Sequence, residues 1–221
     1  ALHHVAFPEA LQALADRLGL AGDTPRPVGP PAPPRAPVAA PDPDPLPEEL
    51  IQSCHRDLLA DSRALAWLLE RKGLPVAAVE LAGLGMAGRS VPAPPHWRGP
   101  RYTIPIPYAD GRPGYKDLRG YRPGGTPKML PWGSGRGGAT VYPWAWCRAC
   151  DPLVWCEGEV DALQFIGRGI GAVTSTCGVD GAIGAGLKLP DLTGKTIYVL
   201  GDADPAGDRL RLELPDRLRL A

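Results

Sequence analysis

The chain has 221 residues, of which 44% are hydrophobic, and its 24 Lys and Arg residues balance its 24 Asp and Glu residues. This length suffices for one large domain or two small ones with a buried core. No apolar run approaches the ~20 residues that span a bilayer, so we expect no membrane partner. The five cysteines are odd in number and no signal-peptide pattern opens the sequence, which together favour a cytoplasmic protein with reduced thiols.

The balanced net charge conceals an uneven distribution. Between Arg89 and Cys150 there are ten basic residues and only two acidic ones, so this segment carries a net charge of +8. The segments before and after it each hold seven basic and eleven acidic residues. A basic middle between two acidic ends predicts that the middle segment binds a polyanion.

The N-terminal part separates into a helix and a linker. The run "VAFPEALQALADRLG" places apolar residues at helical spacing and ends at Gly19, which predicts a short amphipathic helix within residues 1–22. Eleven prolines lie between Pro25 and Pro47, with no aromatic residue among them. Such a composition cannot build a core, so we assign residues 23–47 to an extended proline-rich linker.

Residues 48–150 have the pattern of a small basic α+β subdomain. Residues 47–74 predict two short helices that break near Asp61–Ser62, with Ser62 as a possible cap of the second. A third short helix follows in "PVAAVELAGLG". The alternating run "RYTIPIPY" (101–108) predicts a strand, and a D-G turn leads from it into a second strand, "YKDLRGYR" (115–122).

Residues 151–221 alternate between strand and helix. The predicted strands cover 152–157, 170–175 and 195–201, and the predicted helices cover 159–169, 181–192 and the segment from residue 205. This alternation predicts an α/β domain with a parallel sheet and right-handed crossovers. Functional groups in such sheets gather beyond the carboxyl ends of the strands.

Three acidic residues follow two of these strands. Glu157 ends the first strand, and Asp202 and Asp204 end the third. An isolated D-x-D is more often a turn or a helix cap, but an E-G-E-x-D run after another strand favours a shared site. Converging carboxylates repel one another unless a cation neutralises them, and Mg²⁺ (or Mn²⁺) prefers such oxygen ligands.

These two motifs resemble the Toprim domain. "VWCEGEVDAL", followed some forty residues later by "YVLGDADPAGD", is similar to the motif pair of the Toprim superfamily, which includes bacterial-type primases, type IA and type II topoisomerases and some nucleases. The resemblance implies that Glu157 acts as general acid/base and metal ligand, and that Asp202 and Asp204 are Mg²⁺ ligands. Primase Toprim domains carry a further acidic cluster on a later strand, so residues 151–221 are expected to be a C-terminally incomplete Toprim domain.

The residues upstream resemble DnaG-type primases, most closely their phage and plasmid primase–helicase branch. "LAWLLERKGLPVAAVELAGLG" is similar to the helical lead-in of these primases, and residues 101–143 to their basic N-terminal subdomain. Topoisomerases have no such block before Toprim. "FPEALQALADRLGL" is similar to the helix that follows the primase zinc-binding domain, which implies that zinc belongs only to a domain absent from this chain.

Several basic residues match the primase cleft. Lys128 in "TPKML" matches the P-K motif of the family, and Arg119 or Arg122, together with Arg136, correspond more loosely to its basic cleft residues. Phosphate contacts of this kind hold single-stranded template and nucleotides. The interleaved aromatic residues can stack on bases, although burial is the more common use of each. They are Tyr102, Tyr108, Tyr115, Tyr121 and Trp132.

The resemblance implies a DNA primase that makes RNA primers on single-stranded DNA from ribonucleoside triphosphates, beside a fused or separate replicative helicase. A protein of this kind is nucleoid-associated, or encoded by a phage or plasmid. Two alternatives stay open: a Toprim nuclease with the same carboxylates, and a non-catalytic DNA-binding or replisome-docking module. Asp208 is expected to face solvent, Gly178 to form a turn beside the site, and the lone pair Cys147 and Cys150 to hold no metal.

Overall fold

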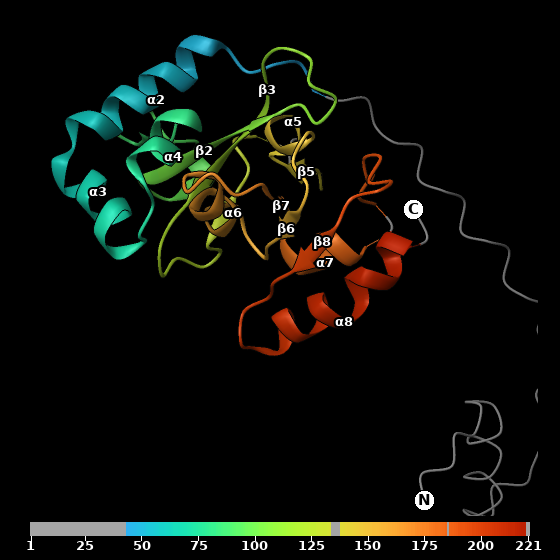
Figure 1. Cartoon of the computed structure of the whole chain (residues 1–221). Helices are drawn as coiled ribbons and strands as arrows, with labels where there is room; N and C mark the ends of the chain where they lie inside the picture. The colour runs from blue at the N-terminus through green and yellow to red at the C-terminus, as the bar shows by residue number, and fades with distance from the viewer. Residues whose placement is uncertain (1–42, 134–137, 185, 220–221) are drawn as a thin grey trace, which may run out of the picture. The chain divides into compact units, whose positions relative to one another are not determined.

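Figure 1 shows the computed structural model, which describes residues 43–133, 138–184 and 186–219. The predicted N-terminal helix, the linker up to residue 42, and Arg136 lie outside the described residues. The described residues all belong to one compact unit, Pro41–Ala221. No helix among them is long and apolar enough to cross a membrane.

Short helices begin this unit, as predicted. They are α2 (Glu48–Ala60), α3 (Ser62–Ala66), the π-helical turn η1 (Trp67–Arg71) and α4 (Val76–Leu81). The break between the first two lies at Asp61, whose side chain accepts a hydrogen bond from the backbone N–H of Ala64 at 3.0 Å. Ser62 is therefore the first helical residue and Asp61 is the cap, because a carboxylate one residue earlier reaches the unpaired N–H groups of the first turn.

An antiparallel sheet packs beside these helices. Its strands, in spatial order, are β1 (Gly85–Ala87), β2 (Arg101–Pro107), β3 (Tyr115–Tyr121) and β4 (Met129–Leu130). Helix α2 lies directly on β1: a Cβ at Gly85 would come within 2.5 Å of the Cys54 backbone, so only glycine permits this approach. A 3-10 turn, η2 (Pro95–Trp97), packs on β3, with the Trp97 ring against Gly120.

A second sheet forms the C-terminal half. Its strands, in spatial order, are β5 (Val141–Tyr142), β7 (Ala172–Ser175), β6 (Leu153–Trp155) and β8 (Ile197–Val199). Strands β7, β6 and β8 are parallel, as predicted, whereas β5 runs antiparallel to β7. The sheet thus begins at Val141, ten residues before the expected boundary at residue 151. So short an apolar run carries no periodicity that could reveal it.

Helices cover both faces of this sheet (Figure 1). They are α5 (Trp144–Cys147), α6 (Glu159–Ile166), α7 (Gly178–Ile183) and α8 (Pro205–Arg219). Leu153 and Trp155 of β6 belong to the core formed with α7 and α8, whereas Val154 packs with α6, as the alternation of side chains along a strand requires. Helix α6 also contacts α4, because its Leu163 shares a core with Ala78, and it joins the two halves.

One predicted helix is wrong in position. The segment 181–192 was expected to be helical, but α7 covers Gly178–Ile183 and ends where Gly184 adopts an extended conformation. Gly184 and Gly186 have low helix propensity, and Pro190 lacks the N–H that a helix interior needs. The described residues after Gly184 therefore run as a loop to β8.

The strand order places a crevice at the carboxyl end of β6. The connection from β6 to β7 crosses one face through α6, and the connection from β7 to β8 crosses the other face through α7. The crossover connections on the two sides of β6 therefore cover opposite faces of the sheet, which makes the end of β6 a topological switch point. Ligands of open α/β sheets bind outside the carboxyl ends of strands at such a switch point. Residue 157 lies at this point.

Candidate active site

The three predicted carboxylates converge. Glu157 follows β6, Asp202 follows β8, and Asp204 precedes α8. One side-chain oxygen of each lies within 4.8 Å of those of the other two. The backbone N–H of Asp202 donates a hydrogen bond to Oε2 of Glu157 at 3.2 Å, which ties the ends of β6 and β8 together. Glu157 is half-buried, and Asp202 and Asp204 are exposed, so water can reach the cluster.

Asp204 has a second, structural contact. Its Oδ1 accepts a hydrogen bond from the backbone N–H of Gly207 at 2.9 Å, so it caps the N-terminus of α8. Its other oxygen stays available. Asp208, one turn further on, is exposed and pairs with Arg211, whose guanidinium also donates to the backbone carbonyls of Gly201 and Asp202. Asp208 is therefore exposed to solvent, as expected, and is not one of the converging carboxylates.

Close backbone packing holds the D-x-D loop. A Cβ at Gly207 would lie 2.1 Å from the carbonyl oxygen and 2.5 Å from the nitrogen of Asp202. A Cβ at Gly201 would lie 2.5 Å from the carbonyl oxygen of Gly207. The two glycines of "GDADPAG" thus let the first turn of α8 rest on the loop that carries Asp202.

We expect Gly207→Ala to displace this loop. The added methyl group has no room against the Asp202 backbone, and such overpacking lowers the free energy of unfolding by about 1–3 kcal/mol. Urea unfolding measures this loss. Gly138→Ala is the control, since no described atom lies within 4 Å of a Cβ there. Equal behaviour of the two variants would contradict the packing account.

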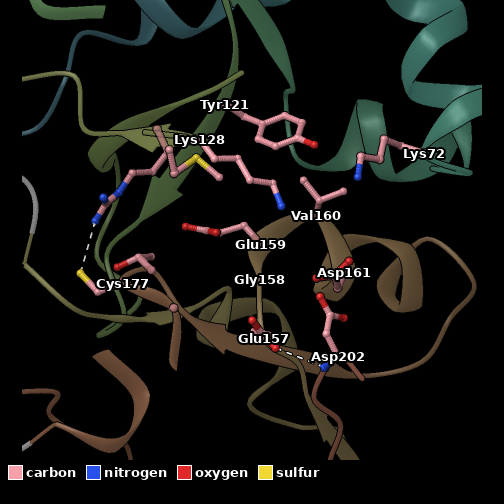
Figure 2. A pocket seen from close by; sticks show the side chains of 14 residues that line it. Lys72, Tyr121, Lys128, Glu157, Gly158, Glu159, Val160, Asp161, Cys177 and Asp202 are labelled. Atoms are coloured by element: carbon pink, nitrogen blue, oxygen red, sulfur yellow. Dashed lines mark hydrogen bonds between the residues drawn. The ribbon is translucent and has the colours of Figure 1, made fainter. Parts of the chain in front are cut away.

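A cavity of about 360 Å³ opens beside the carboxylates, between the two sheets. Figure 2 shows Glu157 and Asp202 at its base, with Lys72 and Lys128 above them. Each lysine Nζ lies 5.9 Å from the centre of the Tyr121 ring. The cavity therefore has one acidic wall, from the second sheet, and one cationic wall, from the first sheet and its helices.

Lys72 escaped the sequence analysis. It is the residue that ends η1, and it comes from the helical lead-in rather than from the basic segment 89–150. The signal that could have found it is the run "ERKGL" within the primase-like lead-in, where a basic residue directly precedes the turn at Gly73. Only the packing of Trp67 of η1 against Tyr121 of β3 reveals that Lys72 lies on the same wall as Lys128.

Two further carboxylates line the cavity. Asp161 lies on α6 one turn after Glu157; burial and then the nearby Asp202 raise its pKa, while Lys72 and Lys128 oppose the rise. Burial also raises the pKa of Glu159 to about 7, despite the opposing charge of Arg119. The E-G-E-x-D run contained both residues, but only the position of α6 shows that they line the cavity.

Arg119 is buried, unlike an arginine that is free to bind a phosphate group from solvent. It borders the cavity, but only 6% of the residue is exposed, and its Nε lies 2.9 Å from Oδ2 of Asp117. It also donates a hydrogen bond to the Cys177 sulfur at 3.9 Å, across to the second sheet. This burial favours an internal role between the two sheets.

Of the other predicted basic residues, Lys128 lines the cavity and Arg122 does not. Both are exposed, and Arg122 donates to the carbonyl of Arg98 at 3.2 Å. Buried Arg101 donates to the carbonyls of Pro127 and Lys128, both at 3.2 Å. Arg101 thus positions the backbone that carries Lys128. Arg136 lies outside the described residues.

The structure also shows where the predicted turn residue Gly178 and the predicted aromatic residues lie. Gly178 has φ +61°, a left-handed conformation that favours glycine, and it lines the cavity. Tyr108 and Tyr121 are each only 2% exposed, which agrees with burial as the more common use. Tyr102 stacks on Trp67 with ring centres 5.4 Å apart.

Comparisons with known proteins bear on the fold. No family model matches the sequence, and no curated protein matches it. The structure is similar to a crystal structure of the Aquifex aeolicus primase that holds the zinc-binding and RNA polymerase domains, with a TM-score of 0.55 and 18% identity over 74% of this chain and 48% of that one. The chain thus spans about half the length of that protein.

Two further solved structures are similar. A structure of the DnaG catalytic core matches with a TM-score of 0.51 and 19% identity over 78% of this chain and 67% of that chain. The primase fragment of the bacteriophage T7 primase–helicase protein matches with a TM-score of 0.48 and 15% identity over 66% of this chain and 58% of that chain. At these identities the likeness is one of fold. The described part of the chain has the fold of the DnaG-type primase catalytic core.

Proposed function

We propose that this chain is the catalytic-core region of a DnaG-type DNA primase, which joins ribonucleotides into short primers on single-stranded DNA. The observation that carries the proposal is the cavity in which Glu157, Asp202 and Asp204 converge opposite Lys72 and Lys128. Nucleotidyl transfer needs such a pairing, because polyphosphate must be held while charge develops at the reacting phosphorus. The primase-core fold of the described residues supports this proposal.

The carboxylate cluster suits Mg²⁺ or Mn²⁺. Glu157 uses Oε2 to accept from the Asp202 backbone, and Asp204 uses Oδ1 to cap α8, so each keeps a second oxygen for an ion. Hard oxygen donors with access to water are the ligands that Mg²⁺ prefers. When bound, the ion would neutralise phosphate charge and stabilise the attacking and leaving oxygens. Zinc would belong only to a domain outside this chain.

The chain's own residues would divide the remaining work. Lys72 and Lys128 would bind the nucleotide phosphates, and the Tyr121 ring beneath both amines would keep them extended over the cavity. Glu157 would accept the proton of the attacking hydroxyl group. Arg122 and the other exposed basic residues of the first half would bind template phosphates, which confer affinity without sequence preference.

The partners follow from this proposal. They would be single-stranded template, ribonucleoside triphosphates and a replicative helicase, fused or separate, as in the phage and plasmid branch. The net charge of +8 between Arg89 and Cys150 supports a polyanionic template.

A primer-synthesis assay tests the proposal. The chain is incubated with a single-stranded DNA template, Mg²⁺ and labelled ribonucleoside triphosphates, and the products are resolved by length. Short RNA products are expected. Nicking of the template without synthesis would instead favour a nuclease, and DNA binding without either reaction would favour a docking module.

The cationic wall makes a separate prediction. Lys72→Met and Lys128→Met should each weaken ATP binding by about 10- to 100-fold, since each removes a charge-assisted phosphate contact. Isothermal titration calorimetry measures the change. Lys188→Met removes the same charge from an exposed position that does not line the cavity, so it serves as the control. A loss as large in the control would show that net charge, and not the wall, determines binding.

A further inference from the structure

Glu159 holds a buried oxygen that nothing in the described protein satisfies. It is the first residue of α6, only 5% of it is exposed, and it lines the cavity. Its Oε1 has no hydrogen-bond partner among the described residues. A buried polar atom left without a partner is energetically unfavourable. Such an atom facing a cavity suggests that a ligand supplies the donor.

The neighbouring groups do not supply that donor. Arg119 is near enough to act on Glu159 electrostatically, but its Nε lies 2.9 Å from Asp117 and one of its amino groups donates to Cys177. The Tyr142 hydroxyl is also buried and near, but it too has no hydrogen-bond partner among the described residues. Figure 2 shows the Glu159 carboxylate extending toward the side of Cys177, away from Lys72 and Asp161.

The position along the chain indicates which part of a nucleotide lies there. Glu159 is two residues from Glu157, whose carboxylate marks the place of the reacting phosphate in the proposed function. The ribose is bonded directly to that phosphate, whereas the base is further away. Lys72 and Lys128 line the same cavity and would hold the remaining phosphates.

We propose that Glu159 is a specificity-determining residue whose Oε1 accepts a hydrogen bond from the ribose 2′-hydroxyl of the incoming ribonucleotide. This proposal rests on the proposed function, and it names how that site distinguishes ribonucleotides from deoxyribonucleotides. A site with a buried acceptor for a hydroxyl group rejects the analogue that lacks it, because the acceptor then stays unpaired.

The test compares two ligands and does not depend on polymerisation. Binding of ATP and of 2′-deoxy-ATP, each with Mg²⁺, is measured by isothermal titration calorimetry on the whole chain. The parent should prefer ATP by about 10- to 100-fold, the worth of one hydrogen bond to a charged group. Glu159→Ala should bind both ligands alike, by losing ATP affinity only. Glu159→Gln, whose amide oxygen still accepts but carries no charge, should keep part of the preference.

Tyr142→Phe is the matched control. It removes the neighbouring buried hydroxyl group and should leave the ATP preference unchanged. A collapse of the preference in this variant would mean that Glu159 acts through Tyr142 and would overturn the proposal. Thermal unfolding of every variant establishes that each is folded.

The remaining outcomes separate the two proposals. If the parent binds both ligands with equal affinity, or if Glu159→Ala weakens both equally, the proposed role of Glu159 is wrong while the nucleotide site stands. If the parent binds neither ligand, the proposed function itself fails, and the role of Glu159 fails with it.

Discussion

Asp202→Ala is expected to abolish primer synthesis, with a loss of about 1,000-fold or more. Asp202 contributes one of the three converging carboxylates, and its backbone N–H binds Glu157. In the proposed function, removing the side chain leaves two carboxylates, which would hold Mg²⁺ too weakly to bring it to the reacting phosphate. Glu157→Ala should have an effect of the same size, because it removes both a ligand and the proposed proton acceptor.

Two measurements check this expectation. Product length analysis reports synthesis, and electron paramagnetic resonance reports Mn²⁺ binding in the absence of nucleotide. Asp208→Ala makes the same charge change six residues away, where the carboxylate pairs with Arg211, and it should keep both properties. Undiminished Mn²⁺ binding by Asp202→Ala would falsify the metal cluster.

Asp117→Ala is expected to cost about 3–5 kcal/mol of unfolding free energy. Asp117 is 1% exposed and lies 2.9 Å from the Arg119 guanidinium. It also accepts hydrogen bonds from the backbone N–H groups of Leu118 at 2.8 Å and Trp132 at 3.1 Å. Alanine would leave the buried charge of Arg119 without its counter-ion and two N–H groups without their acceptor.

Urea unfolding followed by circular dichroism measures this cost. Asp110→Ala breaks the exposed pair with Arg112 and should change stability by less than about 1 kcal/mol. The double variant Asp117→Leu with Arg119→Met should recover much of the loss, since apolar residues often replace a buried ion pair well. If Asp117→Ala is as mild as Asp110→Ala, the buried ion pair does not stabilise the fold.

Local sequence signals predicted most of the elements. The helices of residues 48–81, the hairpin of β2 and β3, and the parallel strands β6, β7 and β8 were each indicated by periodicity or by turn residues. The errors arose where periodicity was weak. β5 is too short to carry a pattern, and the segment after Gly184 has apolar spacing but contains residues that end helices.

The sequence by itself determined the acidic wall of the site. Glu157, Asp202 and Asp204 directly follow strand patterns, and parallel strands bring their carboxyl ends to one edge, so their convergence follows from chain order and sheet geometry. The cationic wall was predicted only in part: Lys128 was identified from its likeness to the primase P-K motif, whereas the place of Lys72 and the burial of Arg119 were decided by the tertiary structure. Lys72 has no local sequence feature that distinguishes it from a solvent-exposed lysine. Arg119 has none that distinguishes it from a phosphate ligand. Their roles depend on how the two halves meet around the cavity, because Arg119 is buried there beside Asp117 and Cys177, and Lys72 lies over the carboxylates.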